Sequence, residues 1–98
     1  MILGYEEMYP GYGMPIMADN FEEDRYEGQD RIVEFLKTGE QVFAKLGWDT
    51  DVFTGDIIPI SPVMLQSGDY RWPAILAYYV QKYNLRLPRD FEEYILKH

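Results

Sequence analysis

The sequence predicts a single α+β domain, residues 1–98, in which a small, mostly antiparallel sheet packs against two C-terminal helices. Apolar residues in the last quarter of the chain recur at helical spacing in two successive segments. The middle of the chain contains short β-prone runs separated by Gly, Pro and Asp, as expected for strands and turns. A chain of 98 residues can bury one modest core, so a second domain is not expected.

The N-terminal segment, residues 1–20, is predicted to be an extended or flexible arm. Residues that interrupt helical periodicity occur throughout it: Gly4, Pro10, Gly11, Gly13 and Pro15. Short pieces such as Ile2-Leu3 can pack on the body in extended form, and a flexible arm is the alternative. Four of the five methionines lie here, and methionine adapts to irregular surfaces.

A short helix is predicted over residues 29–37, because Ile32, Phe35 and Leu36 repeat at helical spacing. Asp30 is a candidate cap, and Gly39 can close the segment. A strand is the competing interpretation, because these apolar pairs do not separate the two periods well.

The predicted sheet comes from three runs with strand character: 41–46, 57–66 and 69–72. Pro59 and Pro62 lack an N–H, which predicts an edge strand or a bulge in the second run. Ser67-Gly68-Asp69 is a hairpin turn signal, so the last two runs are expected to pair in antiparallel fashion.

Two C-terminal helices are the clearest prediction. Pro73 suits a first helical position, and the residues that follow on one apolar face are Leu76, Tyr79, Val80 and Tyr83. Asn84 can close this helix, and Leu87-Pro88 restarts a second one. The second helix has a predicted buried stripe of Phe91, Tyr94 and Ile95. Its charges suit the helix dipole at both ends: Asp90, Glu92 and Glu93 first, Lys97 and His98 last.

Charge is distributed unevenly along the chain, whose net charge is −8. Residues 1–60 contain thirteen acids against four bases, whereas residues 61–98 contain four acids against five bases. This balance argues against direct binding to nucleic acid or to an anionic membrane, because both depend on Lys and Arg. It favours a basic protein partner, with simple solubility as the plainer interpretation.

The composition also bears on compartment and chemistry. The chain has no cysteine, its N-terminus lacks a basic n-region, and its longest apolar run, Ala74–Val80, is too short for a membrane span. A cytoplasmic location is therefore expected. The single histidine, His98, is terminal, so histidine-dependent nucleophile systems and preferred zinc ligands are absent, and neither a cofactor nor a metal is expected.

Two acidic segments are candidates for specific chemistry. Asp49 and Asp51 fit the first ligand positions of a calcium loop, but Phe53, Thr54 and Ile60 do not fit later ones. A polar turn in which Asp side chains bond their own backbone is the preferred interpretation. The carboxylates of residues 22–27 are expected on a solvated face, whereas a catalytic acid needs burial.

Tyrosine and tryptophan beside carboxylates are typical of a surface that binds a basic protein. Trp48, in a turn, is expected to be partly exposed, whereas Trp72 is expected in the core. The predicted partner-contact residues are Tyr5, Tyr9, Tyr12, Glu22, Glu23, Asp24, Tyr26, Trp48, Asp49, Asp51 and Asp56.

The C-terminal part of the chain resembles a known family. The residues that carry this resemblance are Gly68-Asp69-Tyr70-Arg71-Trp72-Pro73, Leu76, Tyr78-Tyr79, Tyr83, Leu87-Pro88 and Phe91. This pattern, over about residues 30–96, is similar to that of small acidic bacterial immunity proteins encoded beside polymorphic secreted toxins. The resemblance implies a cytosolic inhibitor that covers a toxin's active site, and it assigns no functional residue by position.

The leading hypothesis is therefore a non-enzymatic binding protein that inhibits a basic partner, such as a toxin domain or nuclease. A phage-type nucleic-acid mimic is a lower-ranked variant, because it needs carboxylates in a row on one regular element. A small-molecule binder or enzyme would need an acid of raised pKa in a pocket. A further hypothesis is a homo-oligomeric subunit, in which the N-terminal arm packs on a neighbouring copy.

Overall fold

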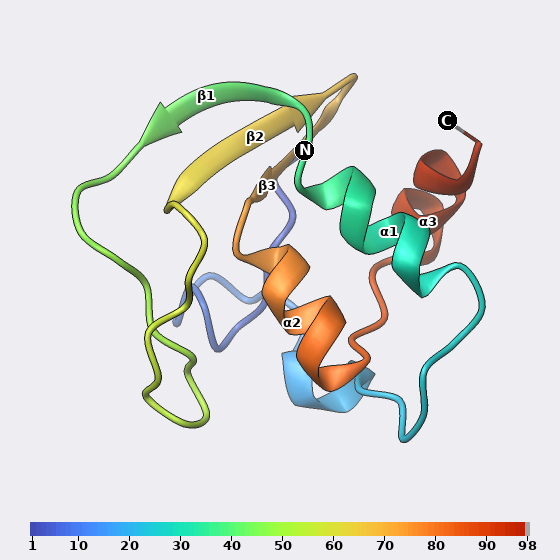
Figure 1. Ribbon diagram of the computed structural model, residues 1–98, viewed down its shortest axis with the longest axis horizontal. Coiled ribbons are helices and arrows are strands. Elements are labelled where there is room, and N and C mark those ends of the chain that lie inside the picture. Colours follow the sequence, from blue (N-terminus) through green and yellow to red (C-terminus); the bar gives the residue numbers. More distant parts are fainter. Residues whose placement is uncertain (98) are drawn as a thin grey trace.

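The computed structural model describes residues 1–97, so the predicted role of His98 at the helix end lies outside the described residues. A three-stranded antiparallel sheet packs with helices in one core, which confirms the predicted α+β class (Figure 1). The elements in chain order are η1 (a 3₁₀ helix, Met17–Asn20), α1 (Gln29–Leu36), β1 (Glu40–Ala44), β2 (Val63–Ser67), β3 (Tyr70–Pro73), α2 (Leu76–Tyr83) and α3 (Arg89–Leu96).

The strands follow the order β1-β2-β3, and both neighbouring pairs are antiparallel. The predicted hairpin between β2 and β3 is confirmed, with Gly68 at a φ of +56° in its turn. The second strand is shorter than predicted, because residues 57–62 form only an isolated bridge from Ile57 to Thr50. Pro59 and Pro62 have no N–H to donate in this stretch, so regular pairing starts at Val63.

The two edges of the sheet differ. Residues 1–3 run beside β3: the Leu3 N–H donates to the Arg71 carbonyl and the Arg71 N–H to the Met1 carbonyl, each at 2.8 Å. The arm thus packs on the body in extended form, as one of the two interpretations predicted, and Leu3, Tyr5 and Met17 are buried. Within the described part of the chain, β1 has no strand on its outer side.

Helix α1 matches the predicted position, with Ile32, Val33 and Leu36 buried. Its cap differs from the prediction: Gly28, at a φ of +83°, precedes the helix, and Asp30 lies in the first turn, where its carboxylate pairs with Arg25. Asp30 is already inside the helix, so it does not take the cap position from which a side chain accepts the first free N–H groups.

Helix α2 begins at Leu76, three residues later than predicted, because Pro73 is the last residue of β3. The predicted apolar face is present: Leu76, Tyr79 and Val80 are buried. Asn84 closes the helix in the left-handed conformation, at a φ of +55°. This conformation ends the helix, and asparagine adopts it more readily than most residues.

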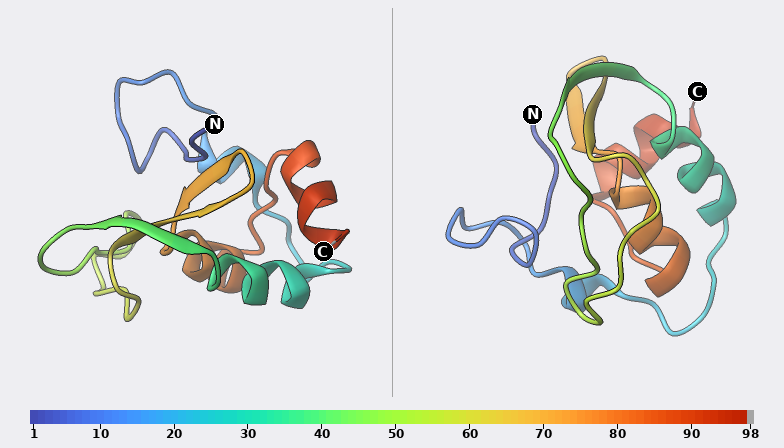
Figure 2. Two further views of the ribbon diagram at one scale, coloured as in Figure 1. Left: turned by 90° about the horizontal axis from the view of Figure 1, so that it is seen from above. Right: turned by 60° about the vertical axis from the view of Figure 1, so that its left-hand side comes forward.

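Helix α3 begins at Arg89, directly after Pro88, and buries Phe91 and Ile95. In Figure 2 the N-terminal arm lies on the opposite side of the sheet from α1 and α2. No helix in residues 1–97 is long and apolar enough to cross a membrane.

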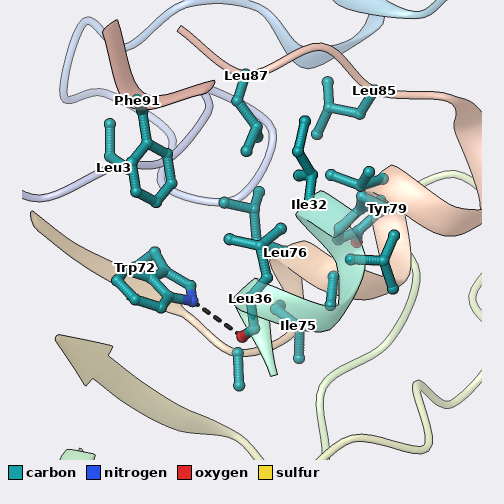
Figure 3. Close-up of a cluster of buried hydrophobic side chains, with 14 of the residues drawn as sticks. Leu3, Ile32, Leu36, Trp72, Ile75, Leu76, Tyr79, Leu85, Leu87 and Phe91 are labelled. Carbon is teal, nitrogen blue, oxygen red and sulfur yellow. Dashed lines mark hydrogen bonds between the residues drawn. The ribbon is translucent and has the colours of Figure 1, made fainter. Parts of the chain in front are cut away.

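The core contains Trp72 at its centre, as predicted (Figure 3). The indole is fully buried, and its Nε1–H donates a 3.0 Å hydrogen bond to the Leu36 carbonyl at the end of α1. Phe91 of α3 and Phe35 of α1 both pack on the indole, with ring centroids 5.5 Å away. This one side chain therefore links β3 to two helices.

Candidate partner-binding surface

A cleft of about 190 Å³ opens between the N-terminal arm, the sheet and the loop that joins β1 to β2. We call residues 45–62 the β1–β2 loop. The cleft brings together Tyr9 and Asp49, two predicted contact residues that are forty positions apart in the sequence. Its wall is mostly apolar and consists of Met8, Tyr9, Phe43, Lys45, Asp49, Thr50, Val52, Pro62, Val63, Met64, Pro73, Ile75 and Tyr79.

The β1–β2 loop is held in place by the carboxylate of Asp51, which is 1% exposed. The hydroxyls of Tyr83 and Tyr78 on α2 donate to Asp51 Oδ2 at 2.7 and 2.8 Å, and Lys82 Nζ lies 3.4 Å from the same oxygen. Asp51 Oδ1 accepts from the backbone N–H groups of Phe53 and Thr54. The predicted polar turn, with an Asp bonding its own backbone, is thus confirmed.

These contacts determine the ionisation of the cluster. Burial by itself raises the pKa of Asp51, but the hydrogen bonds from Tyr83, Phe53, Tyr78 and Thr54 outweigh it and hold the pKa well below its usual range. Burial and the hydrogen bond to Asp51 raise the pKa of Tyr83 to about 12. Asp51 is therefore a buried anion that stabilises the loop, and its prediction as a surface contact residue is wrong for this structure.

Aromatic rings add to this anchor at the end of α2. The ring of Phe21 stacks on Tyr83 at 4.9 Å and contacts the edge of Phe53 at 5.5 Å. Phe53 in turn lies 5.2 Å from Tyr83 and 6.4 Å from Tyr79. The tip of the β1–β2 loop is consequently packed against α2 and the residue that starts the acidic segment.

An exposed apolar segment runs along β1 and the β1–β2 loop. Seven of the eleven large apolar side chains that are exposed in residues 1–97 lie there: Val42, Phe43, Leu46, Trp48, Val52, Phe53 and Ile57. Leu46 is 100% exposed and Trp48 is 61% exposed. In Figure 1 this part of the chain forms an outer arc at the left of the molecule. Clustered exposed apolar residues of this kind mark interaction surfaces.

The predicted acids are divided between two places. Glu22, Glu23 and Asp24 are exposed and lie on the segment that follows Phe21 and leads to α1. Glu22 pairs with Arg86 at 3.3 Å, whereas Asp49 pairs with Lys45. Asp56 is exposed and accepts a hydrogen bond from the Thr54 hydroxyl. The acidic half of the sequence therefore does not form one continuous face.

The predicted tyrosines also differ in position. Tyr5 is 2% exposed and donates to the Arg86 carbonyl at 2.8 Å, so its prediction as a contact residue is wrong for this structure. Tyr26 is half-buried, donates to the Leu85 carbonyl and lies 4.1 Å beneath the Arg86 guanidinium. Tyr12 is 78% exposed on the arm, and Tyr9 is half-buried in the cleft, where burial and the charge of Asp49 raise its pKa.

Sequence reasoning missed the exposed apolar residues on either side of Trp48. Phe43 and Leu46 belong to a run with the pattern of a strand, which normally buries one face, yet all five residues of β1 are exposed. The nearest sequence signal is the pair of prolines at 59 and 62. Because proline disfavours a regular strand in this stretch, no strand of residues 1–97 covers the long β1–β2 loop.

Two carboxyl groups of residues 1–97, those of Glu7 and Asp51, have clearly shifted pKa values, and both are lowered. Burial raises the pKa of Glu7, but the N–H groups of Met17 and Ala18 donate to its carboxylate and lower it overall. Asp51 is the second. Residues 1–97 contain no group of three or more His, Asp or Glu side chains arranged to hold a metal ion.

Comparison with models of protein families, with curated proteins and with solved structures finds no match for this chain. The functional argument therefore depends on the cleft, the exposed apolar segment and the distribution of charge around them.

Proposed function

We propose that this chain is a non-enzymatic, acidic binding protein that inhibits a basic protein partner, such as a toxin domain or a nuclease. The observation that carries the proposal is the cleft in which Tyr9 and Asp49 meet, and the exposed Trp48 directly precedes Asp49 in the chain. An apolar depression with a carboxylate in its wall suits a partner's hot-spot residue, and an exposed Trp next to that carboxylate in the sequence offers a further anchor, because aromatic anchors and desolvated pockets dominate binding energy.

Charge around the cleft supports a basic partner. Residues 1–20 form the arm, and residues 40–57 form β1 and most of the loop. Together these two segments contain seven acids and a single base, Lys45. Asp51 is buried among its own donors, and the other six carboxylates lie nearer the surface. Such a surface accelerates encounter with a cationic partner and suppresses encounter with an anionic one.

The arrangement also favours inhibition by surface coverage. The arm and the β1–β2 loop both contribute residues to the wall of the cleft, so a partner seated there contacts both segments. Glu22 pairs with Arg86 and Asp49 with Lys45, and the acids do not form a row on one regular element, which gives the nucleic-acid mimic less support. Coverage of a toxin's active site also agrees with the resemblance to immunity proteins.

The test is capture of a partner from a lysate of the source cell on the immobilised protein at low salt. We expect one basic protein that elutes sharply as salt rises, because exposed charges are screened. Its toxic or nuclease activity, measured separately, should be lost on mixing with an equimolar amount of this chain.

Two charge reversals of equal size provide the matched control. Asp49→Lys changes the cleft, whereas Glu27→Lys changes an exposed acid on the segment before α1, and both alter net charge by the same amount. We expect Asp49→Lys and Trp48→Ser to lose the partner and Glu27→Lys to retain it. Equal weakening by both reversals, or a captured protein whose activity is unchanged, would contradict the proposal.

A further inference from the structure

The outer edge of β1 is open in a sheet whose other edge is closed. Residues 1–3 hydrogen-bond along β3, whereas β1 has no neighbour on its outer side in the described part of the chain. All five residues of β1 are exposed, and two of them are the apolar Val42 (38%) and Phe43 (58%). An exposed apolar edge strand is a template for pairing with another strand.

The backbone near the end of β1 offers groups for such pairing. The Lys45 N–H donates to the Pro62 carbonyl, so Lys45 and Pro62 are a hydrogen-bonded pair and the Lys45 N–H points towards β2. Hydrogen-bonded and non-bonded pairs alternate in an antiparallel ladder, and the neighbouring pair, Ala44 and Val63, is therefore non-bonded. The Val63 carbonyl indeed accepts from Ala74, on the side away from β1. Ala44 thus directs its N–H and C=O outward.

The start of β1 offers a second outward residue. Alternate residues of β2 face the same neighbour, so Leu65 faces β3, as Val63 does. Its partner on β1, Gln41, is therefore also non-bonded and directs its N–H and C=O outward. The register between β1 and β2 shifts between Gln41 and Phe43, which marks a bulge. In a regular strand, residues three positions apart face opposite neighbours, but the extra residue of the bulge allows both Gln41 and Ala44 to face outward.

The sequence of this edge is complementary to itself. When two copies of residues 40–45 (Glu-Gln-Val-Phe-Ala-Lys) are placed antiparallel about a twofold axis between Val42 and Phe43, Glu40 faces the Lys45 of the other copy. Val42 faces Phe43, and the outward Gln41 faces the outward Ala44. Shifting the axis by half a residue, to Val42 or to Phe43, removes the Glu–Lys pairing.

We propose that this chain forms a symmetric dimer in which the β1 strands of two copies pair antiparallel, with Glu40 opposite Lys45 across the twofold axis. The two three-stranded sheets then become one continuous six-stranded sheet. Opposite-charge and apolar cross-strand pairs stabilise a ladder, and an isologous interface uses each of them twice. The pairing depends on the backbone edge of β1 and not on occupation of the cleft. Phe43 and Lys45 also line the cleft, so Glu40→Lys and Ala44→Pro are the variants that test dimerisation without changing the cleft lining.

Complementary charge reversal tests the register directly. Glu40→Lys sets two lysines against each other across the axis, and Lys45→Glu sets two glutamates against each other, so each variant should dimerise about tenfold more weakly than the unaltered chain.

In this register the two charge variants are complementary to each other. In a heterodimer, position 40 of the first variant and position 45 of the second carry Lys and Glu, and the other pair keeps the original Glu and Lys. Both pairs are then of opposite charge, and we expect a heterodimer of nearly unaltered affinity. Sedimentation velocity over a concentration series measures the unaltered chain, each variant and an equimolar mixture of the two.

Three further variants distinguish pairing at the strand edge from nonspecific apolar association. Ala44→Pro removes an outward N–H and should abolish the dimer, while circular dichroism shows a folded monomer. Phe43→Ser should weaken the dimer, and Ile57→Ser, at an equally exposed apolar position off the strand, should not.

Three results would overturn the proposal. The first is a chain that stays monomeric up to about 1 mM. The second is a mixture of the two charge variants that dimerises no better than either alone. The third is equal weakening by Phe43→Ser and Ile57→Ser.

Discussion

The hydroxyl of Tyr83 donates a 2.7 Å hydrogen bond to the carboxylate of Asp51, a residue 32 positions earlier in the chain. Tyr83 ends α2, and Asp51 lies in the β1–β2 loop between Thr50 and Val52, which line the cleft. Together with Tyr78 and Lys82, this contact ties the loop to the most regular part of the fold. The candidate binding surface is therefore positioned by a buried anion.

Removing this anion should destabilise the fold. We expect Asp51→Ala to lower the free energy of unfolding by about 3 kcal/mol, because a buried charged hydrogen-bond acceptor is lost and its donors are left without a partner. Asp56→Ala, an exposed position in the same loop, should change it by less than about 0.5 kcal/mol. Urea denaturation measures both, and equal effects would show that Asp51 does not anchor the loop.

Acid pH should weaken the protein through the same group. The pKa of Asp51 is lower in the folded state than in the unfolded chain, so its stabilisation is complete above the ordinary carboxyl range. The stabilisation is then lost as pH falls below about 4, because the unfolded chain takes up the proton first. We expect the slope of unfolding free energy against pH to be shallower in Asp51→Asn than in the unaltered chain. Matching slopes would contradict the assignment.

The two tryptophans should report opposite environments. Trp48→Phe leaves the buried Trp72, whose emission should be blue-shifted and insensitive to acrylamide. Trp72→Phe leaves the exposed Trp48, which acrylamide should quench strongly. Trp72→Phe should also cost about 2 kcal/mol of stability, because the Leu36 carbonyl loses its donor and a cavity is left. A blue-shifted, unquenched Trp48 would show that the β1–β2 loop is covered.

The N-terminal residues should contribute to stability through one side chain. Leu3 is 6% exposed and its neighbour Ile2 is 55% exposed, so truncation of the two should have unequal effects. We expect Leu3→Ala to cost about 3 kcal/mol in thermal or urea unfolding, and Ile2→Ala to have little effect. Similar small effects would mean that residues 1–3 do not seal the β3 edge as the structure shows.

Local periodicity is a good guide to the helices, because they depend on residues close together in sequence, and the corner before Pro73 is a good guide to the burial of Trp72. It is less successful for the candidate surface. Tyr5 and Asp51 look like surface contacts in an acidic, Tyr-rich sequence, yet both are buried by hydrogen bonds to residues more than 25 positions away. Nothing in the local pattern distinguishes them from the exposed Tyr12 and Asp56.

By itself, the sequence determined the α+β class, the two C-terminal helices, the hairpin at Gly68 and the strong charge asymmetry between the two parts of the chain. These follow from turn chemistry, from apolar spacing and from composition, which are local or additive properties. Only the tertiary structure decided that Tyr9 meets Asp49 in a cleft, that Asp51 is buried against the tyrosines of α2, and that β1 keeps an open edge. The physical reason is that burial and pairing are set by contacts between distant segments, and the same residue type can satisfy its polar atoms in water or in the interior.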